Sequence, residues 1–322
     1  MVRYSKLFAV IVFCLFLAGI AFSAEPAYMD LLTAGRADEA IRSLTQKTTS
    51  NAATAQDYNL LCRVYFSLED WDNAVKYGER SVQLNPNVSS YYLWLARSYG
   101  EKADSVGALS AIGPARKSLA AFEKAVQLDP NDRGARHDLA EFYATAPSII
   151  GGGKDKAQRL ADDIAAKDPV TAASIRAMVA AREGNDAEAE RQYRLAISTS
   201  GNSAQEWLEI ANFYRRRKRF SEFENAVVQA MNSPRKRPQD LFDAGELLVA
   251  GGRNLPGATT ILKSYIAGPT SDTGPVFRAH YLLGRAYQGL GDRESAIREY
   301  KAALALATNY KPAQVALRKL GG

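Results

Sequence analysis

Residues 58–86, YNLLCRVYFSLEDWDNAVKYGERSVQLNP, read as two helices joined by a short turn. Apolar and aromatic side chains recur at helical spacing in the first half and share one face, formed by Tyr58, Leu61, Cys62 and Tyr65. A second face of this kind follows the turn and is formed by Trp71, Ala74, Tyr77, Ser81 and Val82. Pro86 ends the unit, because the residue before a proline avoids helical geometry. The stretch therefore predicts a pair of helices.

The same pattern recurs along the chain. Ala40 and Ala74, which occupy one slot of the second helix, are 34 residues apart, and later units fill that slot with Ser118, Ala157, Ala189, Phe223, Ala258 and Ala296. An aromatic or apolar residue ends each first helix, namely Tyr65, Tyr99, Tyr143, Ala180, Tyr214, Val249 and Tyr287. Such self-similarity predicts an all-α solenoid, which offers an extended concave surface and rarely a catalytic pocket.

The last full unit is residues 280–306, HYLLGRAYQGLGDRESAIREYKAALAL. It carries, in order, Leu283-Gly284, Tyr287, Gly291-Asp292, Ala296, Tyr300 and Ala303. These spacings resemble the tetratricopeptide repeat. The resemblance implies a right-handed superhelix of about eight helix pairs that binds protein partners through its concave groove and catalyses no reaction.

The repeat predicts one solenoid over residues 24–320. We expect units at about 24–53, 54–88, 89–132, 133–169, 170–203, 204–237, 238–272 and 273–309. A capping helix is expected within 310–320, with proline in its first turn and a polar outer side, because the exposed end of a solenoid must be solvated. Two units are longer than the period, through extra residues at 100–113 and 146–153, and such insertions are either binding elements or plain connectors.

The first 23 residues have the layout of a secretory signal peptide. Arg3 and Lys6 precede the uncharged run 7–22, and Ala21 and Ser23 favour cleavage after residue 23. We therefore expect an exported protein of the periplasm or cell envelope; the alternative is an uncleaved anchor. Removal of Arg3 and Lys6 lowers the formal charge from +6 to +4, with 39 basic against 35 acidic residues. This mild excess is weak evidence for a polyanionic partner. Together with export, it indicates no nucleic-acid partner.

No motif predicts an enzyme, a cofactor or a metal site. Gly151-Gly152-Gly153-Lys154 lacks the Ser or Thr of a phosphate loop, because Asp155 follows the lysine, so the glycines indicate a turn before a helix at 154–166. Cys62 is expected to be a small buried residue. The two histidines are far apart, with His280 expected in the core and His137 on the concave side.

Polar residues of the first helices are the candidate partner-binding site. Arg63 and Arg97 lie one repeat apart, and two arginines on adjacent helices suit a carboxylate. The candidate set is Asn59, Arg63, Arg97, His137, Asn212 and Arg285. We expect an acidic or C-terminal peptide as partner; co-chaperone members of the resembled family bind such a carboxylate with Lys and Asn, which this chain matches only in part. Solvated arginines on a helix face are the alternative.

Two basic clusters could contact anionic lipid headgroups or an acidic partner, or merely end helices. They comprise Arg215, Arg216, Arg217, Arg219, Arg235 and Arg237. The sequence predicts an interaction scaffold as the main function. The basic clusters support an alternative function, a membrane-associated structural or assembly subunit of an envelope complex.

Overall fold

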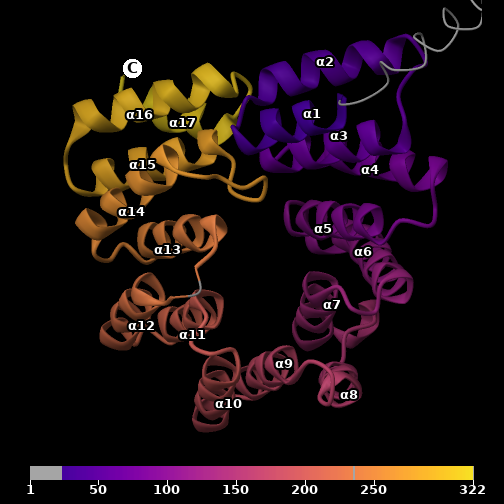
Figure 1. Ribbon diagram of the computed structural model, residues 1–322, viewed down its shortest axis with the longest axis vertical. Coiled ribbons are helices and arrows are strands. Elements are labelled where there is room, and N and C mark those ends of the chain that lie inside the picture. Colours follow the sequence, from indigo (N-terminus) through magenta and orange to yellow (C-terminus); the bar gives the residue numbers. More distant parts are fainter. Residues whose placement is uncertain (1–23, 235, 322) are drawn as a thin grey trace, which may run out of the picture.

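The computed structural model describes residues 24–234 and 236–321, so the predicted signal peptide at 1–23 and Arg235 lie outside the described residues. The fold is an all-α solenoid of tandem helices (Figure 1). The α-helices are α1 Ala24–Thr33, α2 Ala37–Thr49, α3 Ala55–Ser67, α4 Trp71–Leu84, α5 Ser89–Asp104, α6 Ala108–Leu128, α7 Arg133–Thr145, α8 Lys154–Ile164, α9 Pro169–Arg182, α10 Asp186–Thr199, α11 Ala204–Arg216, α12 Phe220–Asn232, α13 Pro238–Gly251, α14 Leu255–Ala267, α15 Val276–Gly289, α16 Arg293–Leu306 and α17 Lys311–Lys319.

Each odd-numbered helix from α1 to α15 pairs with the helix that follows it. Aspartate side chains begin several helices, because Asp70, Asp168 and Asp292 accept hydrogen bonds from otherwise unpaired amides of α4, α9 and α16. The repeated small residue predicted in the second helix is fully buried at Ala74 and Ala296. Helix axes therefore approach closely within a unit.

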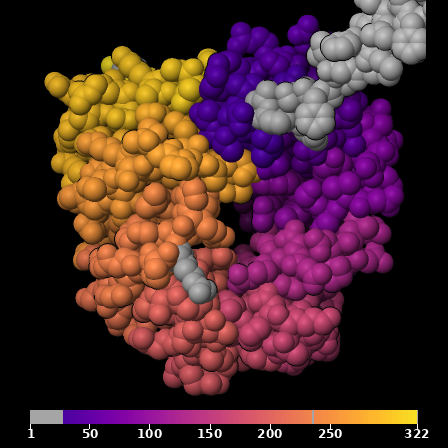
Figure 2. All heavy atoms as spheres, viewed as in Figure 1, coloured from indigo at the N-terminus to yellow at the C-terminus, as the bar shows by residue number. Residues whose placement is uncertain are grey.

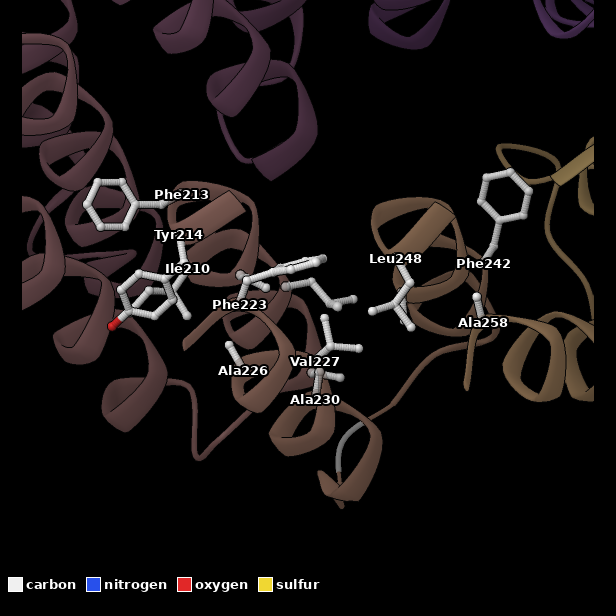
Figure 3. Close-up of a cluster of buried hydrophobic side chains, with 14 of the residues drawn as sticks. Ile210, Phe213, Tyr214, Phe223, Ala226, Val227, Ala230, Phe242, Leu248 and Ala258 are labelled. Atoms are coloured by element: carbon white, nitrogen blue, oxygen red, sulfur yellow. The ribbon is translucent and has the colours of Figure 1, made fainter. Parts of the chain in front are cut away.

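The packing between units is continuous. In the second half of the chain, one apolar cluster joins α9 to α15 and is centred on Phe223, Tyr214 and Leu248 (Figure 3). Each unit buries its apolar face against its neighbours, so buried clusters follow one another from α5–α7 through α7–α9 to α9–α15.

The solenoid closes into a ring. Figure 1 shows α16 and α17 beside α1 and α2, and Figure 2 shows the first and last units in contact over an opening at the centre of the ring. Phe277 and Tyr310 from the C-terminal end pack into one buried cluster with Leu32, Leu44 and other residues of α1–α3. We call this cluster, together with the polar contacts beside it, the ring junction.

Hydrogen bonds reinforce the ring junction. The Asp38 carboxylate accepts from the backbone N–H of Thr308 at 3.0 Å, the Tyr310 hydroxyl donates to Glu69 at 3.1 Å, and Thr270 donates to the Thr33 carbonyl. The expectation of an exposed solenoid end is therefore wrong. Tyr310 is 1% exposed, because α17 begins where the chain meets its own first unit.

Small residues of α9 allow close packing between its neighbouring helices. Where α9 packs on its neighbours it contributes mostly alanines, including Ala172, Ala173 and Ala177, which are fully buried. The side chains of α7 and α11 consequently meet across it, and Arg133 donates to Glu206 at 3.2 Å. Small residues at this point bring the helices on either side closer together.

The insertion at 100–113 is mainly helical. The structure extends α5 to Asp104 and begins α6 at Ala108, so most of residues 100–113 are helical. The extra residues therefore form a longer helical hairpin. Its turn is exposed, and Leu109 is 88% exposed.

The insertion at 146–153 lies against that hairpin. It contains a short 3-10 helix, η1 Ser148–Ile150, and the Arg116 side chain of α6 donates to the Ile149 carbonyl at 3.0 Å. Gly151 has φ of 98°, and a Cβ on Gly152 would meet the Ala146 carbonyl at 1.9 Å, so both positions require glycine. The glycines form the predicted turn, and α8 ends two residues earlier than expected.

Two glycine substitutions test the close helix packing. A Cβ on Gly284 would lie 2.6 Å from the Tyr300 ring, whereas one on Gly100 would meet the Ser118 hydroxyl at an ordinary 3.5 Å. We expect Gly284→Ala to lower the free energy of unfolding by about 1–3 kcal/mol through overpacking. The matched control Gly100→Ala should raise it by about 0.5–1 kcal/mol, because alanine favours helix. Urea unfolding measures both, and equal effects would contradict the packing.

Candidate partner-binding wall

The first helices of the units line the centre of the ring. We call this surface the inner wall, formed by α3, α5, α7, α9, α11, α13 and α15 (Figure 1). Three of the cavities along it contain the candidate residues. The Trp94 cavity has a volume of about 510 Å³ and is lined by α3, α5, α6, α7 and the loop at 268–275.

Trp94 lies between the two arginines that the sequence singles out. The guanidinium carbons of Arg63 and Arg97 lie 5.0 Å and 4.9 Å from the Trp94 ring centroid. Cation–π contact with an indole face holds both side chains in place. The structure thus brings Arg63 and Arg97 together.

Both arginines are already engaged by carboxylates of the same chain. Arg63 forms an ion pair with Asp272, and Arg97 donates through Nε to Asp138 at 2.6 Å. Burial alone would raise the pKa of Asp138, but Arg97 and His137 outweigh it and hold that pKa below its ordinary value. A partner's carboxylate would therefore have to displace Asp272 or Asp138 to reach either arginine.

Asn59 does not face the centre of the ring. It is 1% exposed, so a partner cannot contact it, and its predicted role in partner binding is wrong. The side chain lies on the buried face of α3, whereas the outward face carries Arg63.

His137 and Asn212 line a second cavity. This His137 cavity, of about 210 Å³, is bounded by α7, α9, α10, α11 and the start of the next turn. His137 lies between two carboxylates, with Nδ1 3.7 Å from Asp138 and Nε2 3.8 Å from Glu209. Burial alone would lower the pKa of His137, but these carboxylates and Glu141 raise it to about 9. The imidazole is therefore a cation at neutral pH.

Arg285 lines a third cavity with Asn212 and Arg215. This Arg285 cavity has a volume of about 400 Å³ and lies between α11, α13, α15 and the start of α17. Arg215 donates to the Asn212 side-chain oxygen at 2.8 Å. Burial and the neighbouring charge of Arg216 lower the pKa of Arg215.

The basic clusters are divided among several helices by ion pairs. Arg217 pairs with Asp186 at 2.7 Å, and Arg219 pairs with Glu190 and with Glu222, each at 2.9 Å. Arg237 pairs with Asp240 at the start of α13. Arg216 lies 4.0 Å from Glu141. Arginines held in these ion pairs are less available to bind an anionic surface.

Other candidate groups are structural. Cys62 is fully buried as predicted, and burial raises the pKa of its thiol to about 12. The His280 side chain is 20% exposed, so it is partly buried and not part of the core, and its Nδ1 lies 2.7 Å from Glu299 between α15 and α16. In the described part of the chain, no three His, Cys, Asp or Glu side chains converge as metal ligands. Across residues 24–234 and 236–321, none of the helices has the length and apolar character to cross a bilayer.

The match to a known family model lies on the helix pair α15–α16. Residues 277–310 match the tetratricopeptide repeat. The chain as a whole resembles tetratricopeptide repeat proteins. A comparison with curated proteins finds no match.

Two solved structures show how distant the resemblance is. A tetratricopeptide repeat protein from Parabacteroides merdae ATCC 43184 has 13% identity and a TM-score of 0.40, with 89% of this chain and 99% of that chain covered. Yeast Tom70 has 16% identity and a TM-score of 0.46, with 83% of this chain and 65% of that chain covered.

Sequence reasoning missed the acidic side of the inner wall. Trp94 precedes Arg97 by one helical turn on α5, so its place beside that arginine was open to prediction from the helical spacing. Asp272 was not, because the loop at 268–275 reaches Arg63 only through ring closure. Glu209 of α11 contacts His137 of α7 only because the side chains of these two helices meet across α9.

The pKa of His137 sets a pH window for stability. Since the folded-state pKa lies near 9 and the unfolded value is about 6.5, the stabilisation is complete below pH 6.5 and is lost as the pH rises through 9. We expect the free energy of unfolding to fall by about 1–2 kcal/mol across this window, allowing for partial solvent screening. Urea unfolding from pH 6 to pH 10 should show no such fall in His137→Gln; an equal fall would contradict the assignment.

Proposed function

We propose that this protein is an exported, non-catalytic scaffold that binds a protein or peptide partner along the inner wall of its ring. One observation carries the proposal: the three cavities are contiguous. Glu141 and Thr145 line both the Trp94 and His137 cavities, and Asn212 lines both the His137 and Arg285 cavities. An extended segment would contact successive units without a break.

The lining of this surface suits a protein partner. Aromatic side chains, among them Phe66, Phe122 and Phe142, alternate there with charged ones. Recognition surfaces for proteins combine an aromatic-rich centre with polar groups that fix orientation. Arg97, His137 and Arg285 are among these polar groups. Arg63 is not, because it is paired with Asp272, which lines the cavity in its place.

The export part of the proposal depends on the first 23 residues. A basic head, an apolar run and small residues before Ala24 favour secretion to the periplasm or cell envelope. The membrane-associated alternative needs that segment to stay attached, because the arginines at 217, 219 and 237 are engaged in ion pairs. N-terminal sequencing of the mature protein separates the two: a chain beginning at Ala24 supports export with cleavage, and an intact Met1 supports the anchored subunit.

Filling the shared part of the cavities tests partner binding. Thr145 lines two cavities at the end of α7, so Thr145→Trp should block the inner wall without changing its charge. We expect the mature wild-type protein to capture a partner from envelope extracts and the variant to lose at least about tenfold, or roughly 1.4 kcal/mol of binding free energy.

The matched control places the same bulk on the outside of the ring. Ser198 lies exposed on α10, and Ser198→Trp should capture the partner as wild type does. Circular dichroism confirms that both variants remain helical. Equal capture by wild type and Thr145→Trp would place the partner elsewhere.

A further inference from the structure

Most charged side chains of the inner wall neutralise one another. Arg63 pairs with Asp272, Arg97 pairs with Asp138, and Arg278 pairs with Glu246 at 3.1 Å. A charge held in such a pair contributes little to an incoming ligand unless the ligand displaces its partner. Recognition therefore depends on the charges that remain.

Two carboxylates remain in the Trp94 cavity. Glu101 and Asp104, at the C-terminal end of α5, are both exposed and line the cavity beside Phe122 and Phe142. In the described part of the chain, neither forms an ion pair within 4 Å. Although Glu101 is exposed as a residue, partial desolvation of its carboxyl group in the cavity and the charge of Asp104 raise its pKa, against the opposing charge of Arg278. A cation from outside would relieve this repulsion.

Two arginines remain in the Arg285 cavity. Arg215 reaches it from α11 and Arg285 from α15, with α13 between them. Among the described residues, neither forms an ion pair, and two carboxylates of the same cavity are engaged by other residues: Glu246 pairs with Arg278, and Glu69 accepts from Tyr310. The lowered pKa of Arg215 marks a guanidinium that is partly desolvated and crowded by Arg216.

Residues between the two cavities connect the two unpaired sets. Arg278 belongs to the lining of the Arg285 cavity, yet its charge acts on Glu101 of the Trp94 cavity. Glu69 lines the Arg285 cavity at the end of the helix whose Phe66 and Ser67 line the Trp94 cavity. One bound segment would therefore reach both sets.

We propose that the inner wall selects a partner segment of mixed charge, whose basic side chain enters the Trp94 cavity at Glu101 and Asp104 and whose carboxylate binds Arg215 and Arg285. This rests on the proposed function and adds the partner's chemistry. The aromatic walls hold the aliphatic part of the basic side chain, and the two arginines receive the carboxylate from adjacent units. The acidic group binds at Arg215 and Arg285, not at Arg63 and Arg97 as the sequence suggested.

Three fluorescein-labelled peptides with glycine–serine spacers test the proposal at low salt by fluorescence anisotropy. One carries lysines at one end and glutamates at the other, one carries only the lysines, and one only the glutamates. The lysine-only peptide should weaken roughly tenfold with Glu101→Gln/Asp104→Asn and stay unchanged with Arg215→Gln/Arg285→Gln. The glutamate-only peptide should show the reverse pattern. The mixed peptide should bind more tightly than either and respond to both variants.

Matched controls remove the same charges from the outside of the ring. Asp155→Asn/Glu294→Gln and Arg42→Gln/Arg318→Gln change exposed residues away from the inner wall and should leave all three affinities unchanged. Amidating the C-terminus of the glutamate-only peptide separates the two carboxylate sources: a loss assigns the terminal carboxylate, and no loss assigns the side chains.

The outcomes decide the inference separately from the scaffold function. Failure of the mixed peptide to bind, equal weakening by the control variants, or binding that ignores both inner-wall variants would overturn it. Capture of the natural partner that is lost in Thr145→Trp would still support the inner wall as the binding surface in each of those cases.

Discussion

The contact between the first and last units of the chain constrains everything else in this structure. Phe277 and Tyr310 pack into the apolar cluster of α1–α3, and Asp38 accepts hydrogen bonds from Thr308 beside it. Closure turns a concave groove into a central space bounded on all sides. It also carries the loop at 268–275 to Arg63, so a segment from the seventh unit helps to form a cavity of the second, third and fourth.

The charge pattern of the inner wall follows from this closure. Arginines that would grip a partner in an open solenoid are satisfied by Asp272 and by Asp138, one of them across the ring junction. The unpaired groups that remain are displaced to the end of α5 and to the space between α11 and α15. The partner recognition that we propose therefore depends on residues other than the arginine pair that the repeat pattern predicts.

The local fold was predictable because helix periodicity, small residues and prolines are local signals. The buried slots at Ala74 and Ala296, the turn at 151–153 and the helix pairs follow from spacing alone. Closure was not predictable, because it depends on how the first and last units meet, and no local spacing in the sequence specifies that contact. Asp272 and Glu209 acquire their roles only from that geometry, whereas Arg97, His137, Asn212 and Arg285 reach the inner wall through the repeat itself.

The distance between the two ends of the solenoid tests ring closure most directly. Arg42 on α2 and Asn309 after α16 are exposed on the two units that meet, and spin labels on Arg42→Cys and Asn309→Cys report their separation by electron–electron resonance. Buried Cys62 should stay unlabelled. A closed ring predicts a single short, narrow distance distribution in the free protein. A long or broad distribution would show an open superhelix and would contradict the ring.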